Sequence, residues 1–219
     1  MNTDLFVRSL CFIAIYIGFT VISARYGDVL LAVSSIIMKL LMLFSYFTDG
    51  FAYAGEALTG GIIGAKNPPM VRQTIRWTFV WSMGIAMIFM LIYHFAGVSL
   101  VKVLTSDDTV IAASKDYLPW LLLMPLVGCA AFTWDGIFIG ATGSKEMRNS
   151  MLWSVVAFAA VWIVGILILN RSMSVPSVIS AAPTQYGIIA MHILMGAYFS
   201  HLLARTIYLT LKSPRIYVF

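Results

Sequence analysis

The chain has 219 residues, of which 61% are hydrophobic and only 11% are charged, whereas roughly a quarter of the residues in a typical soluble domain are charged. The net charge of +5 comes from Lys and Arg residues that are scattered singly between apolar runs, which is not the clustered basic face of a nucleic-acid-binding protein. With a mean hydropathy of +0.92, the chain is predicted to sit in lipid, and spans of ~20 residues leave no room for a soluble catalytic domain.

Six apolar runs follow one another along the chain, and each is interpreted as a membrane helix. The first is short, and snorkelling of Arg8 and Arg25 would extend it. The second follows Asp28, a plausible N-cap, and its Gly- and Ala-rich end is expected to pack closely against a neighbour. The runs cover residues 9–24, 29–64, 77–96, 117–139, 151–169 and 187–209, with a polar linker at 170–185. The predicted fold is therefore all-α, a single polytopic bundle of six transmembrane helices over residues 1–219.

The positions of Lys and Arg predict the orientation of this bundle, because cytoplasmic loops carry an excess of basic residues. A cytoplasmic N-terminus would place these basic residues on the cytoplasmic side: Arg8, Lys66, Arg72, Arg76, Lys145, Arg148, Arg205, Lys212 and Arg215. Only Arg25, Lys102, Lys115 and Arg171 would lie outside. We therefore expect both termini in the cytoplasm.

Ionisable side chains inside the runs are the candidates for function, because a charge near the bilayer centre costs about 2.5–3.5 kcal/mol on insertion scales and normally faces protein or water. Asp135 is the first candidate, since Gly136 and Gly140 after it would let a second helix approach closely. It is either a carboxylate that binds a proton or cation, or a structural acid hydrogen-bonded to a neighbouring helix. Asp49 is the second candidate.

The segments around the two aspartates resemble each other: FTDGF at 47–51 and FTWDGI at 132–137. Each continues through small residues to a basic turn that is predicted to be cytoplasmic. An Asp-Gly pair inside an apolar run is unusual on solvation grounds, so its double occurrence strengthens the interest in both aspartates. Chance similarity is the alternative in so apolar a chain.

Three further polar residues are weaker candidates. Glu56 is either a partner for a cation or a solvated group near the cytoplasmic end of its helix. Lys39 lies about 15 Å along the helix axis from Asp49, so it must find another partner or reach water. His192 is a possible supporting residue that would face Asp135 only by conjecture.

The sequence lacks the patterns of several other kinds of site. No His, Cys and Asp cluster has metal-ligand spacing, so no metal and no cofactor is expected. A glycine-rich phosphate loop and a nucleophile elbow are also missing, which argues against an ATP-driven pump or a membrane hydrolase. His94 and His201 are expected near the membrane interfaces.

Several segments carry a resemblance to a known family. They are FSYFTDGFAYAGEAL at 44–58, YLPW at 117–120, DGIFIGAT at 135–142 and EMRN at 146–149. In this order they resemble the DinF-type branch of the MATE (multidrug and toxin extrusion) transporters. The resemblance runs over nearly the whole chain.

The resemblance implies a lobe of a transporter. MATE proteins have two six-helix lobes, here expected in the cell (inner) membrane, and this chain resembles the C-terminal half, without the N-lobe. Family members export organic cations and other toxic compounds in exchange for H⁺ or Na⁺. Asp135 matches an acid on the tenth helix that belongs to the cation site of sodium-coupled relatives, and Asp49 and Glu56 would line or support that site.

The implied partners are the lipid bilayer, an organic cation or other xenobiotic, and a matching N-lobe. A second copy of the chain is a less favoured replacement for the N-lobe, because two C-lobes would have to form an interface suited to a different lobe. The rival hypothesis is a truncated or split-gene fragment, or an accessory subunit, without transport activity of its own.

Overall fold

The structure, a computed structural model, describes residues 2–173 and 184–217, and every regular element in these residues is helical. Within these described residues, six helices are long and apolar enough to cross a membrane, which confirms the predicted all-α six-helix fold. The long helices are α1 (Asn2–Ser23), α2 (Asp28–Gly64), α3 (Pro68–Leu104), α5 (Leu118–Gly140), α6 (Ser144–Ser172) and α7 (Gln185–Lys212). The short elements are α4 (Asp108–Ser114) and the 3-10 turns Ala24–Tyr26, Lys115–Tyr117 and Ser213–Tyr217.

The helix bounds differ from the predicted runs mainly at their polar ends. The run at 29–64 corresponds to α2, which begins one residue earlier, and α1, α3, α6 and α7 also begin before their predicted runs. The runs marked only the apolar stretches, and helical hydrogen bonding continues through polar residues beyond them. Residues 174–183 of the predicted linker at 170–185 lie outside the described residues. Of the remaining linker residues, 170–172 belong to α6 and 185 begins α7.

The predicted N-cap at Asp28 is wrong by one residue. Gly27 is the N-cap, with a φ of 98°, and Asp28 is the first residue of α2. Residues that carry a side chain rarely adopt this backbone conformation, whereas glycine adopts it freely. The turn between α1 and α2 therefore depends on Gly27.

Side-chain caps do begin other helices. Asn67 accepts a hydrogen bond from the backbone N–H of Met70 at the start of α3. Asp107 accepts from the backbone N–H groups of Thr109 and Val110 at the start of α4. The hydrogen bonds donated by Thr109 hold the pKa of the Asp107 carboxyl below its ordinary value, because they favour the ionised form.

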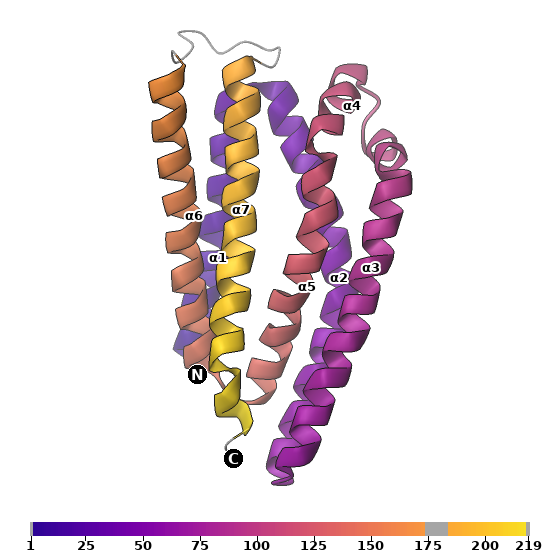
Figure 1. Ribbon diagram of the computed structural model, residues 1–219, viewed down its shortest axis with the longest axis vertical. Helices are drawn as coiled ribbons and strands as arrows, with labels where there is room; N and C mark the ends of the chain where they lie inside the picture. The colour runs from indigo at the N-terminus through magenta and orange to yellow at the C-terminus, as the bar shows by residue number, and fades with distance from the viewer. Residues whose placement is uncertain (1, 174–183, 218–219) are drawn as a thin grey trace.

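The long helices form two groups of three (Figure 1). Helix α6 packs along α7 and α1 packs against α6, while α2, α3 and α5 pack against one another. Contacts between α5 and α7 join the two groups. Both chain ends lie at the same end of the bundle in Figure 1.

Helices α2 and α3 are longer than a bilayer requires. Each has 37 residues, which at 1.5 Å per residue is about 55 Å, against a hydrocarbon thickness of about 30 Å. Their shared end extends beyond the other helices at the bottom of Figure 1. This hairpin therefore reaches past the rest of the bundle on the side of the chain ends.

Candidate functional site

The site begins with the close contact between α2 and α5. A Cβ atom on Gly136 would overlap the backbone of Ala52, and one on Gly140 would overlap the backbone of Glu56. Two glycines one turn apart thus remove the side chains that would hold the helices apart. The close approach predicted from this glycine pair is confirmed, and it fixes the side of α5 from which Asp135 projects.

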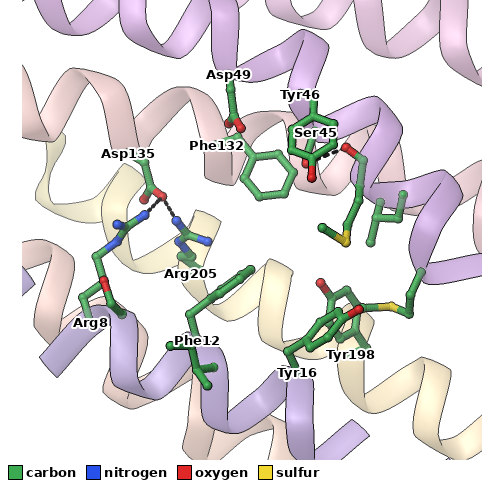
Figure 2. Close-up of a pocket in the computed structure, with 15 residues that line it drawn as sticks. Arg8, Phe12, Tyr16, Ser45, Tyr46, Asp49, Phe132, Asp135, Tyr198 and Arg205 are labelled. Carbon is green, nitrogen blue, oxygen red and sulfur yellow. Dashed lines mark hydrogen bonds and ion pairs between the residues drawn. The ribbon is translucent and has the colours of Figure 1, made fainter. Parts of the chain in front are cut away.

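Asp135 is held by two arginines from other helices. Its Oδ2 atom accepts from Arg8 on α1 and forms an ion pair with Arg205 on α7. Asp135 is 7% exposed and Arg205 is 1% exposed, so the cluster is largely shielded from solvent. Figure 2 shows both guanidinium groups pointing at the Asp135 carboxylate. The two groups of helices are therefore connected by charge as well as by packing.

A cavity of about 540 Å³ opens beside this cluster, between α1, α2, α5 and α7. Asp49 projects into it from α2, opposite the arginines, and the Phe132 ring lies between the two (Figure 2). The Arg205 guanidinium lies 5.9 Å from the centre of the Phe132 ring, within the range of a cation–π contact. The remaining lining is apolar, aromatic or hydroxylated: Ser9, Phe12, Ile13, Tyr16, Met38, Leu41, Met42, Ser45, Tyr46 and Tyr198.

The charges of the cavity lining balance, because Arg8 and Arg205 are matched by Asp49 and Asp135. A neutral set of charges is far cheaper to bury than a single unpaired charge. The hydrogen bonding is nevertheless incomplete: Oδ1 of Asp135 and the Nε atoms of both arginines are buried without a described partner. Two buried donors and one buried acceptor of the cluster are therefore unpaired in the described residues.

A second ion pair holds the N-terminal turn of α1 against α6. Asp4 accepts from Nη1 of Arg148 at 2.5 Å and from the Ser144 hydroxyl at 3.2 Å. Asp4 lies one turn before Arg8 on α1. The start of α1 is therefore tied to α6 by Asp4 and to α5 by Arg8.

The structure brings Asp135 and Asp49 to one cavity, although 85 residues of chain separate them. The two resembling segments around these residues thus meet in space. Glu56, Lys39 and His192 do not line this cavity. Glu56 is half-buried two turns further along α2, and Lys39 lies on an exposed face of that helix.

His192 belongs to a different cluster near the other end of α5. Its Nδ1 accepts from the Trp120 indole N–H at 3.0 Å, and its ring stacks on Tyr117 with centroids 4.6 Å apart. About four turns of α5 separate Trp120 from Asp135. The conjectured contact of His192 with Asp135 is therefore not found.

Sequence reasoning missed both arginines of the site. Arg8 and Arg205 had been counted as cytoplasmic basic residues, but the structure places both inside helices and against Asp135. The signal was present for Arg205, which lies within the apolar run at 187–209. His201, one turn before it, is also fully buried, because α7 packs against both α5 and α6.

Within residues 2–173 and 184–217, no three His, Cys, Asp or Glu side chains are placed so that they could hold a metal ion. The groups that line the cavity are carboxylates, guanidinium groups, hydroxyls, aromatic rings and apolar side chains. These groups can bind charged or amphiphilic molecules and exchange protons.

Comparison with known proteins agrees with the resemblance noted in the sequence. The MatE family model matches residues 5–168. The DNA damage-inducible protein F of Escherichia coli (strain K12) is 36% identical over 159 residues, which are 73% of this chain and 35% of that protein. The chain thus spans about a third of the length of this curated relative. No solved structure matches the chain.

Proposed function

The chain belongs to the MatE family, a family of multidrug efflux transporters and not of enzymes, and from this premise we propose that it forms one lobe of an antiporter coupled to H⁺ or Na⁺. The observation that carries the proposal is the cavity in which Asp49 and Asp135 meet. Carboxylates that face a cavity within the membrane are the usual sites of proton and cation exchange in transporters.

The coupling step of this proposal takes place at Asp135. Protonation of Asp135 removes the negative charge that holds Arg8 and Arg205 together. The two arginines then repel each other, which favours a state in which α1 and α7 move apart. Such a two-state element, biased by the coupling ion, is what an antiporter requires.

Asp49 has a different role in the proposal. In the described part of the chain Asp49 has no ion pair, and its carboxylate faces the cavity. Together with the rings of Tyr16, Tyr46 and Phe132 it can hold an organic cation, because aromatic faces and carboxylates both attract cations. Binding of the cation and of the coupling ion would then compete for the negative charge of one cavity.

The proposal requires a second lobe, because alternating access comes from one lobe moving against another around a shared site. We propose a matching N-lobe as that partner. We also propose that both termini face the cytoplasm of a bacterial cell and that the membrane is its inner membrane. With Arg8 and Arg205 assigned to the site, the remaining basic residues still favour the side of the termini, as the positive-inside rule requires.

The alternative hypothesis is a membrane fragment or accessory subunit that does not transport by itself. A single assay separates the two. Efflux of a fluorescent organic cation is measured in cells that lack endogenous pumps, with this chain alone, with this chain plus a homologous N-lobe, and with the Asp135→Asn variant of each.

Efflux that needs the N-lobe and is lost in Asp135→Asn is the expected result. The matched control is Asp108→Asn, the same change at an exposed position in the first turn of α4, which should leave efflux intact. No efflux with any partner would favour the fragment. Efflux that survives Asp135→Asn would remove Asp135 from the coupling step.

A further inference from the structure

The cluster around Asp135 holds more hydrogen-bond donors than its acceptors can use. Each arginine offers five N–H groups in a fixed fork, yet among the described residues the ion pairs of Arg8 and Arg205 both go to the Oδ2 atom of Asp135. The Nε atoms of both arginines are buried without a described partner. Because buried donors are normally hydrogen-bonded, this excess indicates that an acceptor-rich group belongs beside them.

Arg8 and Arg205 both line the 540 Å³ cavity, and the Arg8 side chain is 24% exposed. Arg205 is 1% exposed, so its guanidinium is fixed by packing. Most of the other cavity walls are apolar or aromatic, with Phe12, Ile13 and Met38 among them. One end of the cavity therefore offers guanidinium donors, and the rest offers a surface for an apolar group.

We propose that Arg8 and Arg205 form a binding site for the anionic head group of an amphiphilic molecule whose apolar part occupies the cavity. A carboxylate, sulfonate or phosphate group can bridge two guanidinium forks through two or more oxygens, which is the strongest arrangement for such pairs. The inference rests on the cavity being the ligand site of the proposed function. It extends the ligands of that site from organic cations to amphiphilic anions.

Asp135 occupies the position of this head group when the cavity is empty. One of its oxygens already carries both ion pairs, whereas the other has no described partner. An incoming oxyanion would share or replace the Asp135 carboxylate as the partner of the two arginines. Asp135 therefore competes with the ligand, and its removal should strengthen anion binding.

Two ligands of opposite charge and equal chain length test the proposal. Binding of radiolabelled decanoate and of decyltrimethylammonium is measured on the 219-residue chain in nanodiscs of phosphatidylcholine, with empty nanodiscs subtracted. Saturable decanoate binding is expected. Arg8→Gln should weaken it about tenfold or more, because a charge-assisted bidentate contact is lost.

Two variants separate a binding role from a structural one. Arg25→Gln is the same change at an exposed position in the 3-10 turn Ala24–Tyr26, after the far end of α1, and it should leave decanoate affinity unchanged. Asp135→Asn should raise decanoate affinity about threefold or more, since a neutral amide competes less well for the arginines. A merely structural cluster would lose binding in Asp135→Asn as well as in Arg8→Gln.

The proposal is overturned if decanoate shows no saturable binding, if Arg8→Gln and Arg25→Gln behave alike, or if Asp135→Asn weakens binding. Retained decyltrimethylammonium binding by Arg8→Gln shows that the variant is folded. Adding phosphatidylglycerol to the nanodiscs identifies the source of the anion, because competition with decanoate assigns the site to a lipid head group and its absence to a free amphiphile. A lack of efflux in cells would not affect these binding results, so the two proposals fail separately.

Discussion

Arg8 and Arg205 reach the same carboxylate oxygen, Oδ2 of Asp135, from the first and the last long helix of the described chain. This shared contact joins α1 to α7 beside the cavity. Because Asp135 itself lies on α5, three helices meet in one charge cluster. The stability of the bundle and the state of the site are therefore linked.

Replacing Arg205 with Met tests this link. The change keeps most of the side-chain volume but removes one partner of a buried ion pair, which typically costs 3–5 kcal/mol. We expect about 3 kcal/mol, the lower end of this range, because Arg8 continues to balance the charge of Asp135. The free energy of unfolding is measured in mixed micelles by titration with a denaturing detergent, followed by circular dichroism.

The matched control is Arg25→Met. Arg25 is exposed, so this change should shift the unfolding free energy by less than about 0.5 kcal/mol. Equal effects of the two substitutions would show that the buried pair contributes nothing specific to stability.

Gly136→Ala should destabilise the bundle by about 1–3 kcal/mol, the usual cost of overpacking. The added Cβ would overlap the backbone of Ala52, so α2 and α5 would have to separate. Gly84→Ala, in the interior of α3 with nothing within 4 Å of the added Cβ, is the control and should be neutral or stabilising by up to about 1 kcal/mol. Thermal unfolding of both variants in the same detergent checks the sign, and a stabilising Gly136→Ala would refute the close contact.

Tyr93→Phe should cost about 0.5–1.5 kcal/mol. The buried Tyr93 hydroxyl donates to the carbonyl oxygen of Leu40 at 2.5 Å and so joins α3 to α2. Tyr53→Phe is the matched control, because Tyr53 is 68% exposed. Unfolding of the two variants is compared in the same micelles, and indistinguishable midpoints would mean that the hydroxyl contact does not add to stability.

The cap of α4 should respond to acid in a defined direction. The pKa of Asp107 is lowered in the folded state by hydrogen bonds from Thr109 and from backbone N–H groups. Its contribution to stability is therefore fully present above the unfolded pKa of about 3.9, and it is lost as the pH falls through the lower folded pKa. NMR shifts of the Thr109 and Val110 amide protons should titrate below pH 3.9.

The control for this titration is Asp107→Asn, which keeps a capping oxygen but cannot ionise. Its amide shifts at Thr109 and Val110 should not titrate in this range. A midpoint for the natural residue at or above 3.9 would contradict the hydrogen bonds described for Asp107.

How far the sequence could be interpreted depended on the kind of signal. Apolar runs are local, and each of the six was found because a span needs ~20 apolar residues regardless of its neighbours. The glycine pair at 136 and 140 also predicted a close helix contact correctly. The cap of α2 was missed because Gly27 acts through backbone conformation, which leaves no side-chain signature at Asp28.

The candidate site was only half predictable. Asp49 and Asp135 stood out because an acid in an apolar run has no ordinary solvation. Arg8 did not, because a basic residue at the end of a run is equally compatible with snorkelling into water, whereas Arg205 lies within its run and carried a signal that was not used. Only the packing of α1 and α7 against α5 directs them inward.

By itself, the sequence determined the class of protein, the number of spans and the presence of two acids within them, because these properties follow from the transfer of local segments into lipid. The tertiary structure decided which acid is paired, which cavity both acids share, and that His192 and Lys39 lie elsewhere. Such partnerships join residues far apart in the chain, and they depend on which faces of the helices meet when the bundle packs.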